Sequence, residues 1–582
     1  MKMKTAISAL VVLSVLVCAS RSSAQPVRGT VQGQVLDSTG GAVAGAQVVL
    51  TNEATAARLS VRTDDRGWFV ITPVDPGTYQ LEVTQTGFRR HLQSFTLQVN
   101  QRLRRDFVLQ PGPVTETVTV SAPESVDRTA TSLSSRFDPD RIANLPLDGR
   151  NFLDLALLTM GSAPAAQGSA ASVRGEFAFN VNGAREDANT YLLDGAYNFD
   201  PKLNNIAVRP PVDAIREFEI IGSTPDASFG KGAGAQVNVV TRSGANRVSA
   251  TAYEFWRTAA FNAKNFFAPE NEPSPEYRRH QYGAALGGPI SKDRVFFFAD
   301  YEGTRLSEGI TRLTTVPTLA ERDGDFSQSL FRPPLNPFTG QPFPNNQIPS
   351  FFQNQVGVNI AHLYPRPNRD DPFANFVSSP ELVDDADQFD TRVDYRGDRF
   401  TLTSRYSFAD RRMFEPFAGP GFSTVPGFGN DAPRRAQSFV VSTTSQAGSR
   451  FLNEARVAWT RVANKVLQEN QGESLSNEVG LPELSPNPRD WGMALVTVAG
   501  FASLGHEFNN PQEGKTNHWQ FSDTLTWTSG RHLVKFGGEA RLLRQQAFRD
   551  VQARGLLQFS GLITTNPLAD LLLGLPTVTV GA

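Results

Sequence analysis

The chain has 582 residues, six histidines, one cysteine and a net charge of −2. This length exceeds that of one ordinary domain, and about three or four folded units are expected. The small net charge and the absence of long basic runs argue against a nucleic-acid partner.

The N-terminus has the composition of a secretory signal peptide. Lys2 and Lys4 precede the apolar stretch 6–19, and the small residues 22–24 follow it. A basic start, an apolar middle and a small-residue cleavage site are the three parts of such a signal. We therefore predict a signal peptide over residues 1–24 and export from the cytoplasm.

Cys18 lies inside this segment and offers an alternative as a lipid-attachment cysteine. The residue before Cys18 is Val17. A signal that resembles the usual lipoprotein type would carry Gly, Ala or Ser at this position. No other stretch holds about 18 uninterrupted apolar residues, so a transmembrane helix is not predicted. Any membrane span must then be a β-barrel.

Short alternating segments separated by turn residues fill residues 25–112. Strands are expected at 29–36, 46–51, 68–72, 79–84 and 95–109. Several short strands with turn signals every 8–12 residues or so predict an all-β sandwich. Segments 33–37, 63–69 and 76–79 closely resemble the carboxypeptidase regulatory-like domain. This resemblance implies a prealbumin-like sandwich with a carbohydrate-binding-like fold.

The resemblance to a regulatory-like domain does not make the chain a peptidase. A zinc carboxypeptidase needs two imidazoles and a carboxylate around one metal, and the six histidines are far apart in the sequence. His506 and Glu507 begin like a zinc-protease motif, but Asn510 stands where the second histidine should be. No catalytic residue, metal ligand, cofactor or enzymatic activity is predicted.

Residues 113–125 are predicted to form a linker with one isolated extended segment. The segment comprises Glu116, Thr117, Val118, Thr119 and Val120. An extended segment between two domains can pair with the sheet edge of a partner. It resembles a TonB box, which implies that a TonB-type energy-coupling protein pulls on it. The alternative is an ordinary linker strand.

Residues 126–246 mix short helix signals with strands. Helices are expected at 138–144 and 151–159, and strands at 179–183, 190–194, 215–221 and 235–241. The order of 180–183, 193–195, 215–221 and 232–244 strongly resembles the plug domain of a TonB-dependent receptor, which implies an α+β plug. Leu193, Asp194 and Gly195 predict a turn with an Asx bond.

Three glycines precede the last predicted plug strand: Gly230, Gly232 and Gly234. We expect them to form a tight backbone turn. A phosphate-binding loop would need Lys-Ser/Thr after the glycines and a helix behind them, and this sequence has neither.

Residues 247–582 alternate in polarity over strands of membrane-spanning length. In 389–396, Phe389, Val393 and Tyr395 share one face, and Asp390 and Asp394 lie on the other. Similar alternation occurs at 294–302, 399–408, 451–462, 518–528 and 531–542. Strands of about 10 residues that are apolar outside and polar inside are typical of an outer-membrane barrel.

Charged residues of the polar faces are predicted to face the barrel lumen: Arg392, Asp394, Arg405, Arg456 and Glu539. They would either hydrogen-bond the plug or solvate a polar wall. Short turns at 396–398 and 529–530 contrast with long connections at 305–386, 410–435 and 465–515. Short periplasmic turns and long external loops are typical of outer-membrane barrels.

Segments 296–303, 344–349 and 566–576 resemble the Oar-like subgroup of TonB-dependent receptors. In that subgroup a regulatory-like domain, a plug and a large barrel follow one another. We count roughly nine to eleven candidate strands after residue 248, about half the number with which such receptors close. The last residues also lack a terminal aromatic. We therefore expect a truncated barrel that belongs to a longer protein.

These features together predict a mainly β protein of the cell outer membrane with its N-terminal sandwich in the periplasm. The predicted function is TonB-dependent import of a scarce or bulky substrate, a siderophore, an oligosaccharide or a peptide. The barrel would contact outer-membrane lipid. The alternative is a surface-displayed carbohydrate-binding or structural protein that transports nothing; it would not need the extended segment or the plug.

Overall fold

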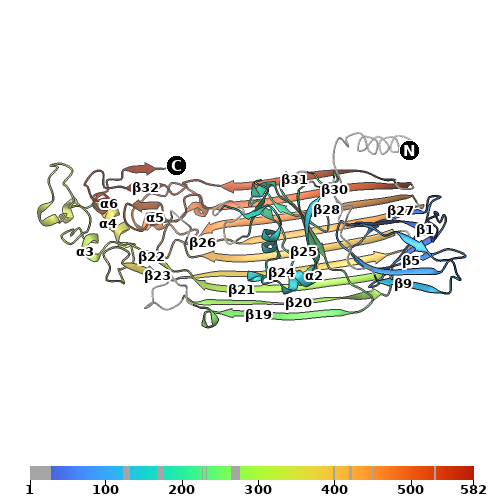
Figure 1. Ribbon diagram of the computed structural model, residues 1–582. Helices are drawn as coiled ribbons and strands as arrows, with labels where there is room; N and C mark the ends of the chain where they lie inside the picture. Colours follow the sequence, from blue (N-terminus) through green and yellow to red (C-terminus); the bar gives the residue numbers. More distant parts are fainter. Residues whose placement is uncertain are drawn as a thin grey trace, which may run out of the picture.

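The computed structural model describes residues 28–121, 132–166, 176–263, 275–417 and 422–581, apart from gaps at 224, 226, 231, 398–399, 449 and 530–531. The predicted signal peptide and Cys18 lie outside these residues. The described chain is mainly β. A sandwich stands at one end of a long-stranded sheet, a compact cap stands at the other, and a central domain lies against the sheet between them (Figure 1).

The N-terminal sandwich contains two sheets. The first contains β4 (Trp68–Val74), β1 (Gly29–Asp37), β7 (Arg102–Arg104) and β8 (Phe107–Leu109). The second has the order β3 (Arg58–Arg62), β2 (Gln47–Asn52), β5 (Gly77–Thr84), β6 (Arg90–Leu97) and β9 (Thr117–Ser121). Alternate residues such as Val48, Leu50 and Leu81 are fully buried between the sheets. This alternation is the two-residue period that predicted the sandwich.

The central domain is built on a five-stranded sheet. Its order is β10 (Leu133–Phe137), β17 (Ile215–Ser223), β18 (Gln236–Thr241), β13 (Thr190–Leu193) and β14 (Ala196–Tyr197). Two small hairpins flank it: β11 (Ser162–Pro164) with β12 (Phe179–Val181), and β15 (Phe199–Asp200) with β16 (Asn205–Ile206).

Short helices cover this central sheet: α2 (Pro139–Asn144), η1 (Asp148–Arg150), η2 (Phe152–Leu158), η4 (Glu186–Ala188) and η5 (Val212–Ala214). The expected helix at 151–159 is therefore a 3-10 helix. Asn151 caps it by accepting the Leu153 N–H at 3.3 Å, and Phe152 packs on Phe218 at 5.3 Å between ring centroids. The apolar residues of the helix close one side of the domain core.

The long-stranded sheet has ten strands. They are β19 (Ser249–Thr258), β20 (Tyr277–Ser291), β21 (Val295–Gly309), β24 (Glu381–Arg396), β25 (Phe400–Glu415), β26 (Asn430–Asp431), β27 (Arg434–Ala447), β28 (Phe451–Gln468), β30 (Gln512–Ser529) and β31 (His532–Arg549). Their pairing is antiparallel throughout. Strands such as β28 and β30 have 18 residues, longer than the segments that alternation alone predicted.

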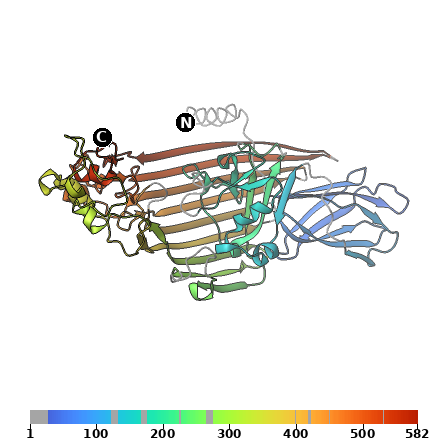
Figure 2. The ribbon, with the colours of Figure 1, turned by 60° about the vertical axis from the view of Figure 1, so that its left-hand side comes forward.

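The two faces of the long sheet have opposite polarity. Asp390 and Asp394 are each 2% exposed, whereas Trp519 is 43% and Phe536 77% exposed. The polar face is covered by the central domain, and the aromatic face points away from it (Figure 2). A soluble protein buries its aromatic face instead, so this inversion indicates lipid as the solvent of the outer face.

The sheet is curved but open within the described residues. β19 and β31 stand at the two ends of its strand order and do not pair with each other. The short connections between strands lie at the end that carries the sandwich, and the long ones at the opposite end (Figure 1). No described helix combines the length and the apolar character that a membrane crossing requires.

The long connections fold into a cap with its own core. It contains α3 (Leu319–Arg322), α4 (Gln355–His362), α5 (Leu475–Glu478), α6 (Pro567–Leu572), the pair β22 (Arg312–Thr314) and β23 (Phe376–Ser378), and a sheet of β29 (Leu495–Val498), β32 (Leu556–Phe559) and β33 (Val578–Val580). Phe326, Tyr364 and Met493 are buried together with Leu571. The apolar run 571–575 thus contributes to the cap core.

Candidate functional site

Asp194 is the centre of the contact between the central domain and the sheet wall. It begins the β13–β14 turn with φ of 50°, and Gly195 follows with φ of 75°. Its carboxylate accepts the Thr241 N–H at 3.0 Å and the Thr241 hydroxyl at 2.8 Å. It also pairs with Arg405 Nε at 2.9 Å. The expected turn is present, but the Asp194 carboxylate contacts Thr241 and Arg405 of the sheet wall instead of closing an Asx turn.

Arg392 and Asp394 extend this contact along β24. Arg392 pairs with Asp394 at 2.9 Å and with Asp194 at 3.4 Å, and it donates to the Thr241 carbonyl at 3.0 Å. Asp394 accepts the Ser243 hydroxyl at 2.7 Å. These side chains are at most 11% exposed. Two charged residues of the predicted lumenal set therefore contact the central domain directly.

Arg456 and Glu539 lie on the other side of the same turn. Arg456 Nη1 donates to the Gly195 carbonyl at 3.2 Å. Glu539 accepts from Gln520 at 2.8 Å, and Gln520 in turn accepts the Tyr197 N–H at 2.7 Å. Arg541 pairs with Glu539 and lies over the Tyr197 ring at 4.4 Å. All five residues of the predicted set face the central domain, directly or through Gln520.

Two of the three glycines before β18 are needed for close packing. A Cβ on Gly232 would lie 2.2 Å from the Ala188 carbonyl oxygen, and one on Gly234 would lie 2.5 Å from Asn189 Oδ1. A Cβ on Gly230 would meet nothing within 4 Å. Gly232 N–H donates to the Gly230 carbonyl at 3.3 Å. The chain therefore turns here. A side chain would clash at Gly232 and Gly234, whereas Gly230 has room for one.

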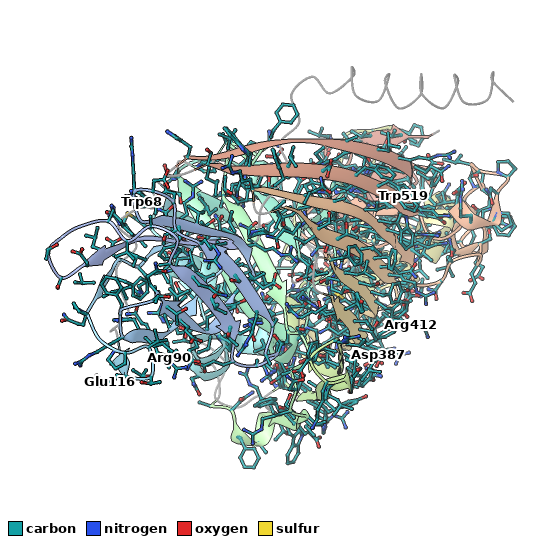
Figure 3. The ribbon with its side chains drawn as sticks, turned by 90° about the vertical axis from the view of Figure 1, so that its right-hand side faces the viewer. Trp68, Arg90, Glu116, Asp387, Arg412 and Trp519 are labelled. Atoms are coloured by element: carbon teal, nitrogen blue, oxygen red, sulfur yellow. The ribbon has the colours of Figure 1, made fainter. Side chains whose placement is uncertain are left out.

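The predicted coupling segment is paired with the sandwich. β9 lies parallel to β6, with Arg90 opposite Thr117 and Ser94 opposite Ser121. Arg90 N–H donates to the Glu116 carbonyl at 2.9 Å, and Arg89 pairs with the Glu116 carboxylate at 2.9 Å. Arg90 and Glu116 lie at the same margin of the sandwich (Figure 3). The segment is thus an ordered edge strand rather than a free linker.

The sandwich is attached to the rest of the chain by ion pairs. Arg28 pairs with Asp75 at 2.7 Å and with Glu454 of β28 at 3.3 Å. Arg396 of β24 pairs with Asp75 at 3.4 Å. Burial alone would raise the pKa of Asp75, but the neighbouring guanidinium groups of Arg28 and Arg396 hold it well below its ordinary value.

A buried carboxyl also joins the sandwich to the central domain. Glu217 of β17 accepts the Val99 N–H at 2.9 Å and is 6% exposed. Burial raises its pKa to about 7, although the Val99 N–H and the charges of Arg136 and Arg216 act in the opposite direction.

A cavity of about 330 Å³ lies where sandwich, central domain and sheet meet. Its charged lining is cationic on balance: Arg28, Arg216, Arg392, Arg396, Arg456 and Lys535 face Asp75, Asp194 and Glu454. The contacts between the central domain and the sheet include hydrogen bonds, ion pairs and small apolar clusters such as Ala196 with Val440 and Ala458. Polar contacts of this kind can be exchanged for water when domains move.

The histidine that begins the zinc-protease-like motif has a structural role. His506 is fully buried in the cap, and its Nδ1 accepts the Met493 N–H at 3.0 Å. Burial lowers the pKa of this imidazole to about 3. Across the described residues, no group of three or more His, Cys, Asp or Glu side chains is arranged to hold a metal ion.

Sequence reasoning missed several contact residues, chiefly Asp75, Glu217 and Gln520, and it predicted only a turn for Asp194. Gln520 lies on the buried polar face of β30, between exposed Trp519 and Phe521, so strand alternation could have identified it. Asp75 and Glu217 meet partners far away in the sequence, and no local pattern announces such contacts.

Comparison with known proteins identifies two families in the chain. Residues 240–582 match the family described as Outer membrane beta barrel domain, and residues 30–110 match the carboxypeptidase regulatory-like domain. The TonB-dependent transporter Oar of Myxococcus xanthus is 29% identical over 299 residues, which are 48% of this chain and 27% of that protein.

The solved structures that align with the chain include an outer-membrane transporter and a siderophore receptor. The transporter YddB of Escherichia coli aligns with a TM-score of 0.46 at 12% identity, over 74% of this chain and 52% of that one. The siderophore receptor PirA of Acinetobacter baumannii aligns with a TM-score of 0.40 at 13% identity, over 72% and 49%. The chain spans about half the length of these structures.

These relatives are described as transporters and receptors, not as enzymes. The barrel family and the Oar relative agree with the mainly β fold and place the chain in the outer membrane. The chain belongs to the outer membrane beta barrel domain family, carries an N-terminal carboxypeptidase regulatory-like domain, and is a homologue of the Oar-type TonB-dependent transporters.

Proposed function

We propose that this chain takes part in energy-coupled import across the outer membrane. The central domain acts as the plug of the barrel, and residues 116–120 act as the handle that a TonB-type coupling protein holds. The sandwich lies on the periplasmic side. The observation that carries the proposal is the polar seat of the central domain, in which Asp194 contacts Arg392, Arg405 and Thr241.

A polar seat suits a plug that has to move and return. An apolar core resists separation because exposing it to water costs about 25 cal/mol per Å². Ion pairs and hydrogen bonds can be replaced by bonds to water, so their net contribution is only about 0.5–3 kcal/mol each. A pull on the handle would first break the contacts around Asp194 and Gly195 and open a hydrated path beside the wall.

The substrate belongs to the classes that passive pores do not supply: a siderophore, an oligosaccharide or a peptide. Related proteins are described as siderophore receptors, which supports the first class as the initial choice for testing. The cationic cavity at the sandwich end would attract a substrate with carboxylate or other anionic groups.

The handle can be tested by proline substitution in the natural host. Thr119→Pro removes a backbone N–H, whereas Thr119→Ala keeps it and changes only the side chain. A strain lacking the gene is complemented with each version and grown on ferric siderophores, oligosaccharides or peptides as the limiting nutrient. We expect Thr119→Pro to lose uptake and Thr119→Ala to retain it, because strand addition uses main-chain hydrogen bonds.

Equal uptake by both variants would refute the proposal that residues 116–120 act as the handle. If the Thr119→Pro chain also bound oligosaccharides at the cell surface as well as the parent chain does, the alternative function would be favoured. That alternative is a surface-displayed carbohydrate-binding protein that transports nothing.

A further inference from the structure

The described part of the sandwich ends in a strand that has one edge occupied and one edge open. In the five-stranded sheet the order is β3–β2–β5–β6–β9, and β9 has no strand on its far side among the described residues. The chain approaches this position through several bonds. Arg89 N–H donates to the Gln110 carbonyl at 2.9 Å, and Gly112 N–H donates to the Gly87 carbonyl at 3.1 Å.

The pairing register shows which backbone groups of β9 are used. In a strand, successive residues point their N–H and C=O groups to opposite edges. The Glu116 carbonyl accepts the Arg90 N–H, and the ladder continues without a register shift to Ser94 and Ser121. The backbone N–H and C=O groups of Val118 and Val120 therefore point to β6. Thr117, Thr119 and Ser121 direct their N–H and C=O groups to the open edge.

We infer that the sandwich is a platform that presents residues 117–121 as a pre-formed edge strand to the coupling protein. This inference rests on the proposed function of the same segment. The partner is a protein with a free sheet edge, which adds its own strand beside β9. The sandwich, β9 and the partner strand then form one continuous sheet.

Two physical arguments favour presentation over concealment. The edge that binds β6 and the edge offered to the partner are different, so docking on the sandwich does not compete with coupling. A free handle must also lose backbone conformational entropy when it pairs, and the docked strand has already lost it. Pre-organisation of this kind increases affinity without adding any contact.

The sandwich can serve as a platform because it is fixed to the barrel wall. Asp75 contacts both Arg28 and Arg396, and Arg28 reaches Glu454. The presented strand is therefore held at a defined place at the sandwich end of the barrel.

Disulfide locks test the inference in the full chain in detergent. The Arg90 and Thr117 side chains meet on one face, with Arg90 Nε donating to Thr117 Oγ1 at 3.2 Å. Arg90→Cys with Thr117→Cys locks the start of β9, and Ser94→Cys with Ser121→Cys locks its end in a separate variant. Binding of a purified periplasmic C-terminal domain of a TonB-type coupling protein is measured before and after oxidation.

We expect each oxidised chain to bind the coupling domain as tightly as its reduced form, or up to about tenfold more tightly, since the lock only removes undocked conformations. A loss of binding of more than about tenfold on oxidation, restored by reductant, would overturn the platform and show that β9 must leave β6. Absence of binding in both redox states would refute the coupling role together with the platform.

Two neighbouring proline variants provide a second readout. Thr119→Pro removes an outward N–H, so β9 should stay docked, with unchanged amide-exchange protection in β6, while coupling-domain binding is lost. Val120→Pro removes an N–H that faces β6, so protection in β6 should fall and binding should weaken. If Val120→Pro instead bound the coupling domain more tightly, the sandwich would be a competitor and the inference would fail.

Discussion

At the scale of single residues, the contact between the central domain and the sheet wall depends on charges that are buried together. Arg405 has a fully buried side chain, and Asp194 is 8% exposed. Removing one partner leaves an uncompensated buried charge, which costs about 3–5 kcal/mol. Asp194 also holds Thr241 and Arg392, so its loss affects three contacts at once.

We therefore expect Asp194→Ala to destabilise the seated central domain by about 3–5 kcal/mol. Arg435→Ala is the matched control, because it breaks the Arg435–Asp410 pair, whose arginine is 54% exposed. An exposed pair contributes only about 0–1 kcal/mol. Thermal unfolding in detergent with amide exchange over 190–241 measures both. Similar losses for the two variants would contradict the importance of burial.

Glu217 should give the contact between sandwich and central domain a pH dependence. Its pKa is raised from 4.5 to about 7, so the folded protein binds a proton that the unfolded chain releases. The stabilising contribution of the neutral carboxyl is complete below about pH 4.5, decreases as the pH rises and is lost above about pH 7.

We expect the melting temperature to fall between pH 5 and pH 7.5 in the parent chain and to change much less in Glu217→Gln. The glutamine keeps an acceptor for the Val99 N–H but cannot ionise. Calorimetry across this range measures the difference. If the melting temperature of Glu217→Gln still fell with pH as in the parent chain, the titration would belong to another group.

At the scale of elements, the three glycines of the turn into β18 differ in the space available for a side chain. Gly232→Ala would place a Cβ 2.2 Å from the Ala188 carbonyl oxygen, which forces the backbone at 186–190 to shift. Gly230→Ala meets open space. We expect a loss of about 1–3 kcal/mol for the first, as for an overpacked core site. The second should be neutral or stabilising by less than about 1 kcal/mol.

The two variants differ only in position, so urea unfolding followed by amide exchange over 190–241 compares them directly. Equal stabilities would show that the approach of Gly232 to Ala188 relaxes at no cost.

Strand polarity was predictable from sequence because it is a local property. A period of two places Asp390 and Asp394 on one face regardless of what covers them, and the structure buries both. The cap was not predictable in this way. Its core joins Phe326, Met493 and Leu568 from three separate connections, and long-range contacts leave no period in the sequence. The docking of β9 on β6 was missed for the same reason.

At the scale of the whole molecule, the outward face of the sheet carries the membrane contact. Phe521 and Trp519 are each more than 40% exposed and stack at 6.3 Å between ring centroids. A charge on a lipid-facing site costs about 2–4 kcal/mol near the bilayer midplane and less near its surfaces.

We therefore expect Phe521→Arg to reduce the fraction of chain that inserts into lipid vesicles and resists protease. Phe521→Ala, which leaves the site uncharged, should insert nearly as well as the parent. Ser522→Arg adds the same charge at the neighbouring residue, whose side chain lies on the buried face. It therefore measures the cost of steric crowding in the interior and not the cost of placing a charge in lipid. Equal insertion of Phe521→Arg and the parent chain would place this face away from lipid.

In the proposed function, the sandwich lies across one end of the barrel, and its attachment is a condition for both coupling and passage. Asp75 is the charge that Arg28 and Arg396 share. Because its pKa lies below 3.8, its contribution is present above about pH 4 and lost as the pH falls further. With Glu217 acting in the opposite direction, attachment should be tightest at about pH 4–5, and it should weaken below this range and progressively above it up to about pH 7.

Asp75→Asn should release the sandwich, seen as a longer spin-label distance between 39 and 447 and faster protease cleavage near the sandwich. Asp106→Asn, which breaks the exposed Arg104–Asp106 pair within the sandwich, should change neither. An unchanged distance in Asp75→Asn would mean that the Arg28–Glu454 pair and the Glu217 contact suffice to hold the sandwich, and that in the proposed function passage occurs around it.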